Sequence, residues 1–125
     1  MAYSEMDYMN IGGGQIHEVI GTPTPIGTVK VNNTVYTKYR QIVNFGALPT
    51  ATAGTKAVAH GISGLDFRKV LSIYGTAIGS AEAYVLPNSI ATGFIAFYVN
   101  NTNIVATTNL DWSNYSAVMT IEYYQ

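Results

Sequence analysis

Residues 114–124, NYSAVMTIEYY, carry the most regular alternation of apolar and polar side chains in the chain. Successive side chains of a strand point to opposite faces. One face of this stretch would therefore receive five apolar or aromatic side chains: Tyr115, Ala117, Met119, Ile121 and Tyr123. The other face would receive Ser116, Thr120 and Glu122. The pattern predicts a strand of an antiparallel sheet that packs over a core on one side and meets water on the other.

Short stretches of the same kind precede this strand and are separated by Gly, Pro or Asn. Residues 28–31 and 34–45 flank Asn32-Asn33, whose side chains tolerate positive φ and so favour a two-residue hairpin turn. A second hairpin is expected around residues 100–102, between strands at 94–99 and 103–108. Further strands are expected at 56–60, 67–77 and 82–86.

Two of these strands also have a clear facial pattern. In 34–45, apolar residues (Val35, Tyr39, Val43, Phe45) share one face, and polar ones (Lys38, Arg40, Asn44) share the other. In 67–77, the residues expected on a common face are Phe67, Leu71, Ile73 and Ala77. No long stretch has helical spacing. About seven to nine short strands, roughly ten residues apart, predict an all-β fold, an antiparallel β-sandwich of jelly-roll type.

The composition limits what such a domain could do. A chain of 125 residues suits one domain, and the lack of cysteine excludes disulfides, thiolate metal sites and thiol nucleophiles. Only 10% of the residues are charged and the net charge is -1, with no basic cluster larger than Lys38 with Arg40 or Arg68-Lys69. We therefore expect no nucleic acid partner. So little charge also indicates that part of the surface is covered by another copy of the chain or by a larger particle.

The first 27 residues differ from the remainder. The run Gly12-Gly13-Gly14, Pro23 and Pro25 interrupt any strand pattern there, so residues 1–27 are expected to form an N-terminal attachment arm and linker, and 28–125 the sandwich. The residues expected to contact a partner are Tyr3, Tyr8, Ile11 and Ile16; a frayed terminus is the alternative. The acidic start MAYSEMD is unlike a signal peptide, and no apolar run is long enough for a membrane span, so we expect synthesis in a cytoplasm and no membrane insertion.

Candidate catalytic and metal sites are weak. His60, Ser63 and Asp66 have the residue types of a catalytic triad, but such residues are common in turns, and Asp66 is expected to cap a turn. No phosphate-loop Lys-Ser/Thr follows the glycine run. Two histidines, His17 and His60, are too few for a zinc site in one subunit, although a metal shared on a threefold axis stays open. We expect no catalysis, no cofactor and no metal.

The aromatic residues are the better candidates for binding. The chain has ten tyrosines, more than a sandwich of this size can bury with every hydroxyl satisfied, and tyrosine suits rigid surface contacts. For each ring a core or subunit-interface role is the alternative. Trp112 is predicted to stack on a sugar ring, with Asp111 and Tyr115 as neighbouring ligand-binding residues.

The order of several motifs resembles a module at the C-terminal ends of tailed-bacteriophage tail fibres, tailspikes and other receptor-binding structural proteins. The resemblance covers about three-quarters of the chain and rests on VYTK (35–38), VNFGALP (43–49), KAVAHGI (56–62), IYGTA (73–77) and WSNYSAVMTIEYY (112–124). The stretch before the first of these motifs, 21–27, departs from the family pattern.

The resemblance implies an all-β, usually trimeric module that is displayed on a virion, is made in the bacterial cytoplasm and often serves host-surface binding or trimerisation. It implies no catalytic residue. The expected function is non-enzymatic attachment to host-surface glycans as a homotrimer, with residues 1–27 contacting other tail or capsid proteins. The alternative is a capsid-decoration or head-fibre protein whose arm docks on the virion and whose role is assembly only. An enzyme acting on polysaccharide is a third reading, for which the sequence places no carboxylate pair.

Overall fold

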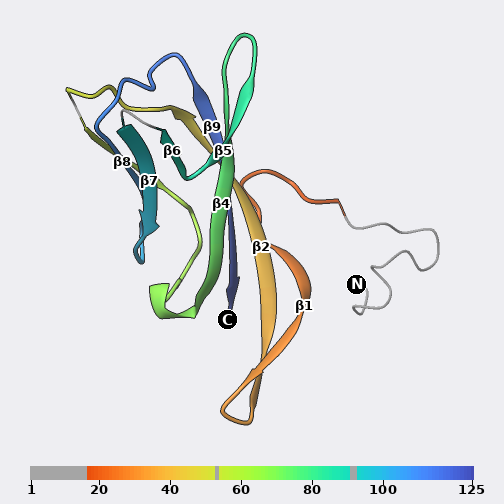
Figure 1. Cartoon of the computed structure of the whole chain (residues 1–125). Coiled ribbons are helices and arrows are strands. Elements are labelled where there is room, and N and C mark those ends of the chain that lie inside the picture. The colour runs from red at the N-terminus through yellow and green to blue at the C-terminus, as the bar shows by residue number, and fades with distance from the viewer. Residues whose placement is uncertain (1–16, 53, 91–92) are drawn as a thin grey trace.

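The computed structural model describes residues 17–52, 54–90 and 93–125. Nine strands of these residues form two antiparallel sheets that pack face to face as a sandwich (Figure 1). Across the same residues there is no α-helix, and one 3₁₀ turn occurs at Phe67–Lys69. The predicted all-β antiparallel sandwich is therefore confirmed.

The chain crosses between the sheets several times. The five-stranded sheet has the order β1 (Thr24–Val31), β2 (Thr34–Ala47), β9 (Ser116–Tyr124), β4 (Val70–Ile78) and β5 (Ala83–Leu86). The four-stranded sheet has the order β3 (Thr55–Ala59), β8 (Asn103–Thr108), β7 (Gly93–Val99) and β6 (Asn88–Ile90). The most regularly alternating strand, β9, is the central strand of the larger sheet, paired with β2 on one side and β4 on the other.

The core lies between the two sheets. The predicted inner face of β9 is confirmed, since Ala117, Met119, Ile121 and Tyr123 are all buried. They meet apolar side chains from the other sheet, including Ile95 and Ile104, in one cluster. Each large side chain buried in this way contributes about 1.5–3 kcal/mol, which is the main source of stability in a fold with no disulfide.

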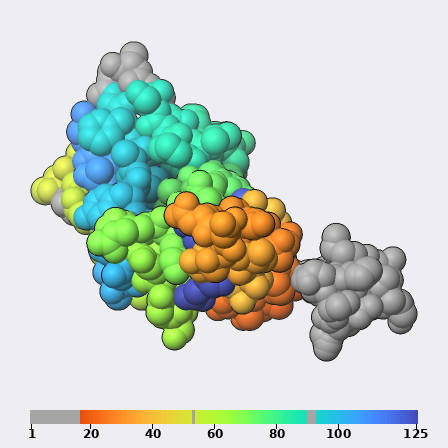
Figure 2. Space-filling model, turned by 90° about the horizontal axis from the view of Figure 1, so that it is seen from below, coloured from red at the N-terminus to blue at the C-terminus, as the bar shows by residue number. Residues whose placement is uncertain are grey.

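The first hairpin forms as its turn residues predict. Asn32 and Asn33 have φ angles of 49° and 68°, the left-handed conformation that a tight two-residue turn requires. β1 begins at Thr24, earlier than the expected start at Thr28, and includes Pro25. Proline is tolerated there because β1 is an edge strand, and the register shifts between Pro25 and Gly27. In Figure 2 this hairpin is orange, and green atoms lie between it and the cyan part of the molecule.

The predicted facial pattern of residues 67–77 is wrong at its first half. Phe67 is 45% exposed and Leu71 is 48% exposed. Asp66 caps a 3₁₀ turn by accepting from the Arg68 N–H at 3.0 Å, so Phe67 lies outside the strand. A register shift between Val70 and Ser72 then reverses the alternation, and Val70 packs against the core in place of Leu71. The cap predicted for Asp66 is confirmed.

A buried polar link joins the two sheets. The Gln41 side chain of β2 donates through Nε2 to the carbonyl oxygen of His60, which directly follows β3. His60 Nδ1 accepts from the Ile62 N–H at 3.1 Å, so its proton is on Nε2, 3.0 Å from the Asn100 carbonyl in the β7–β8 turn. Both ring nitrogens are thus used by the backbone, and His60 holds a corner of the fold.

Candidate functional site

Five residues from β5 and the β8–β9 loop line a small aromatic pocket. They enclose about 160 Å³ and are Tyr84, Leu110, Asp111, Trp112 and Tyr115. All three of the residues predicted to bind a ligand, Asp111, Trp112 and Tyr115, belong to this set. The β4–β5 hairpin and the β8–β9 loop lie together at one end of the sandwich, opposite the tip of the β1–β2 hairpin (Figure 1).

The three aromatic rings contact one another in pairs. Tyr84 meets the Trp112 ring edge to face, with centroids 5.6 Å apart and an interplanar angle of 82°. The centroid of Tyr115 lies 5.6 Å from that of Tyr84 and 5.4 Å from that of Trp112. Rings at these spacings attract one another and form a continuous apolar surface rather than a cage with an open centre.

The β8–β9 loop is held in place by its backbone. The Trp112 N–H donates to the Pro49 carbonyl at 3.1 Å, and the Tyr115 carbonyl accepts from the Leu48 N–H at 3.0 Å. Thr108 Oγ1 accepts from the Leu110 N–H at 2.9 Å at the start of the loop. A loop fixed at both ends in this way presents its side chains with little freedom to lose on binding.

Trp112 is placed differently from the expectation. Its side chain is only 5% exposed, so it cannot offer an open ring face, whereas Tyr84 is 37% exposed and Tyr115 is partly exposed. The residue that sequence reasoning missed is therefore Tyr84. The Trp112 indole Nε1 is buried and has no hydrogen-bond partner among the described residues. An indole N–H is a donor only, so one buried donor next to the pocket is left without a partner among the described residues.

A polar hollow adjoins the aromatic pocket on the other side of Tyr115. It encloses about 370 Å³ and is lined by Gly79, Ser80, Glu82, Asn114 and Tyr115. The Tyr115 hydroxyl donates to Glu82 Oε2, which raises the pKa of Tyr115 to about 12 and keeps it protonated. A Cβ on Gly79 would lie 2.6 Å from the Tyr115 ring, so glycine is needed there for the ring to lie against the hairpin.

The electrostatics of the two hollows are negative. Hydrogen bonds from Ser113 lower the pKa of Asp111, and its carboxylate accepts from the Ser113 N–H at 2.9 Å. Asp111 is thus ionised at neutral pH. Neither lining contains a lysine, arginine or histidine among the described residues. Together, the partly exposed tyrosine rings and the carboxylates can contact the apolar face and the hydroxyls of a polar ring compound.

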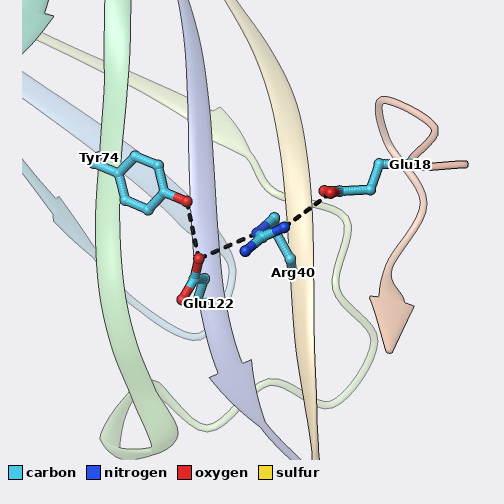
Figure 3. Close-up of polar contacts among 4 residues, drawn as sticks. All are labelled: Glu18, Arg40, Tyr74 and Glu122. Carbon is cyan, nitrogen blue, oxygen red and sulfur yellow. Dashed lines mark hydrogen bonds and ion pairs between the residues drawn. The ribbon is translucent and has the colours of Figure 1, made fainter. Parts of the chain in front are cut away.

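A second polar cluster lies on the outer face of the five-stranded sheet (Figure 3). Arg40 of β2 bridges Glu18 at 2.9 Å and Glu122 of β9 at 3.1 Å. Tyr74 of β4 donates to the same Glu122 oxygen at 2.9 Å. The Gly21 N–H also donates to the Ile42 carbonyl at 2.7 Å. These contacts fix the segment before β1 to the sheet, and we assign the cluster a structural role.

Other predicted residues fall into two groups. Tyr3, Tyr8, Ile11 and Ile16, predicted to attach the arm, lie outside the described residues. Of the metal candidates, His60 is occupied by the backbone, and the described part of the chain contains no group of three or more His, Asp or Glu side chains placed to hold a metal ion. No helix in that part is long and apolar enough to cross a membrane.

Comparison of the chain with protein-family models, with curated proteins and with solved structures finds no match.

Proposed function

We propose that the chain is a non-enzymatic, homotrimeric virion module of the tail-fibre kind, which attaches to saccharides on the host surface. The aromatic pocket carries the proposal. The partly exposed rings of Tyr84 and Tyr115, backed by the buried Trp112, suit the apolar face of a pyranose ring, and Asp111 with the adjoining polar hollow offers partners for its hydroxyls. The pocket encloses about 160 Å³ and the hollow beyond Tyr115 about 370 Å³, so the two together fall within the range of about 300–1,000 Å³ that is usual for ligand sites.

Two further observations support the phage assignment. The motif order of residues 35–124 resembles tail-fibre and tailspike modules. The chain also passes from β2 to β3 and from β8 to β9 between the sheets, so that β2 lies beside β9 and β3 beside β8. Such paired wrapping is typical of a jelly roll, which is common in viral structural proteins.

The trimer is supported by the outer face of the four-stranded sheet. Residues that alternate with the core positions there are uncharged: Thr55, Ala57, Ala59, Phe94, Ala96, Tyr98, Asn103, Val105 and Thr107. Phe94 and Tyr98 are exposed, and Tyr98 is 55% exposed. Exposed aromatic side chains on an uncharged face are typical of an interface. Three copies would also present three pockets, which strengthens attachment to a repetitive glycan.

Saccharide binding is tested on a glycan array with the full chain and two variants. Tyr84→Ala removes the exposed ring of the pocket, and Phe67→Ala removes an exposed ring away from both the pocket and the proposed trimer face. We expect wild type and Phe67→Ala to retain the same specificity and Tyr84→Ala to lose at least tenfold in affinity, since ring stacking is worth about 1–3 kcal/mol in related aromatic platforms. Binding by wild type that Tyr84→Ala leaves unchanged would remove the pocket from the proposal.

The oligomeric state is tested separately by light scattering. We expect a mass of three times 13.5 kDa. Tyr98→Glu should shift the chain to monomers, because a carboxylate buried at an interface without a cation is strongly unfavourable. Thr76→Glu, at an exposed position on the other sheet, is the matched control. A wild-type monomer would contradict the trimer and leave the saccharide site standing.

The second candidate function is capsid decoration or head-fibre assembly. It is favoured by the contacts that fix Glu18 and Gly21 to β2, because they hold the segment before β1 against the larger sheet. Deletion of residues 1–16 should leave the sandwich folded and abolish association with virions. If that association is lost and no glycan binds, the assembly function is the better one.

A further inference from the structure

The aromatic pocket has a charge pattern that selects among saccharides. Asp111 lies in its lining and Glu82 in the adjoining hollow, both as acceptors of hydrogen bonds from neighbouring groups, Ser113 and Tyr115. No cationic side chain lines either space among the described residues. A ligand there meets two carboxylates and no positive charge.

The distribution of basic residues along the chain reinforces this pattern. All six lysines and arginines and both histidines precede residue 70, whereas the residues lining the pocket and the hollow all follow residue 78. Several cations are also engaged elsewhere. Arg40 is paired with Glu18 and Glu122, Arg68 with Asp66, and the Lys56 ammonium with the Ala47 carbonyl.

We infer that the pocket selects neutral or amine-bearing saccharide units and discriminates against units that carry a carboxylate, sulfate or phosphate. The inference rests on the proposed saccharide function and specifies its ligand class. An anionic unit would lose water without gaining an ion pair with a cation and would be repelled by Asp111. An ammonium group would instead be attracted by Asp111 and by the faces of the tyrosine rings.

The neutral donors and acceptors of the pocket fit the same class. The Trp112 N–H is buried and has no partner among the described residues, so it is not presented to a ligand. The Tyr115 hydroxyl is already committed to Glu82, so it cannot serve as a donor to an anion without breaking that bond. The described lining therefore offers an anion no cationic donor to offset its lost hydration.

The test uses matched methyl glycosides that differ in one charge. For the gluco, galacto and manno configurations, the neutral hexoside, the 2-amino sugar and the uronic acid are titrated into the full-length ¹⁵N-labelled chain and followed by NMR. We expect the uronic acids to bind about two- to fivefold more weakly than the neutral hexosides at low salt, with the difference shrinking in 0.5 M NaCl. Amino sugars should bind at least as tightly as neutral hexosides.

Two variants test which carboxylate causes the discrimination against uronic acids. Asp111→Asn should reduce the discrimination against uronic acids, and Glu122→Gln, which removes a carboxylate on the outer face of the larger sheet, should leave it unchanged. Uronic acids that bind as tightly as neutral hexosides, or discrimination that survives Asp111→Asn, would overturn the inference while the saccharide function stands. If none of the glycosides shifts a resonance of the pocket residues, the saccharide function fails, and the selectivity with it.

Discussion

The outer faces of the two sheets satisfy their polar groups in different ways. On the five-stranded sheet, Arg40, Glu122 and Tyr74 come from three neighbouring strands and bind one another (Figure 3). On the four-stranded sheet, the outward positions of β3, β7 and β8 are uncharged, and the only charged residue of its strands, Lys56, binds carbonyls of β2. The polar side chains of one face bind one another, whereas the other face carries uncharged side chains, with Phe94 and Tyr98 exposed.

The largest expected loss of stability comes from Gly75→Val, a substitution on the inner side of the five-stranded sheet. A Cβ on Gly75 would overlap Met119 Sδ and lie 2.5 Å from the Val118 carbonyl oxygen of the paired strand β9. Backbone cannot move aside as a side chain can, so Gly75→Val should cost more than about 3 kcal/mol or prevent folding. Urea denaturation measures the loss.

The control for this substitution is its neighbour. Thr76 is exposed on the outer side of the same strand, and Thr76→Val introduces the same side chain there. It should change stability by less than about 0.5 kcal/mol. Equal losses in the two variants would show that the close approach of β4 to β9 is not what excludes a side chain at Gly75.

The second largest expected loss of stability comes from His60→Ala, directly after β3 of the four-stranded sheet. His60→Ala removes both the acceptor of the Ile62 N–H and the donor to Asn100, and it leaves a cavity at a buried position. We expect a loss of about 2–3 kcal/mol, measured by thermal or urea denaturation. Ser63→Ala, at an exposed position nearby, should be nearly neutral. A small loss for His60→Ala would mean that the link between the sheets depends on Gln41 alone.

Much of the fold could be predicted because its signals are local. The alternation of residues 116–124 and the Asn32-Asn33 turn require only neighbouring residues, and both are confirmed. The face of Leu71 could not be predicted, because a register shift beside Val70 reverses the alternation, and such a shift depends on how β4 pairs with the distant strand β9.

The site was predictable only in part for a related reason. Asp111, Trp112 and Tyr115 are close in sequence, so one loop could be recognised as a unit. Tyr84 and Glu82 come from the β4–β5 hairpin, and only the strand order β9-β4-β5 brings them to that loop. The burial of Trp112 could not be predicted from the sequence either, since a tryptophan in a loop can be buried or exposed.

The third expected loss of stability depends on pH and concerns Glu122, on the outer face of the five-stranded sheet. Burial raises the pKa of Glu122, but the hydrogen bonds from Tyr74 and Arg40 and the positive charges of Arg40 and Lys38 outweigh it and hold the pKa below its usual value. A carboxyl group whose pKa is lower in the folded state than in the unfolded state stabilises the fold at pH values above its unfolded pKa, near 4.3. This stabilisation is lost as the pH falls through the folded pKa.

Glu122→Gln should therefore cost about 1 kcal/mol at pH 7 and much less at pH 3. The difference is read from urea denaturation of both proteins at the two pH values. An uncharged outer face has no such dependence, so Thr107→Ala on the four-stranded sheet should shift stability equally at both pH values. A pH-independent loss in Glu122→Gln would mean that the carboxylate contributes by packing rather than by charge.

The smallest expected changes in stability come from removing one tyrosine hydroxyl from each outer face. Tyr74→Phe removes the donor to Glu122 and should cost about 0.5 kcal/mol, because the bond is partly exposed. Tyr98→Phe removes a hydroxyl that has no hydrogen bond within the described residues and should leave the stability of the folded chain unchanged. Only Tyr74→Phe should also raise the pKa of Glu122, followed by NMR of its side-chain carboxyl carbon, since Tyr74 is one of the groups that lower it. A shift of the Glu122 pKa in both variants would mean that the two faces are electrostatically connected through the core, and the contrast between the two outer faces would then be wrong.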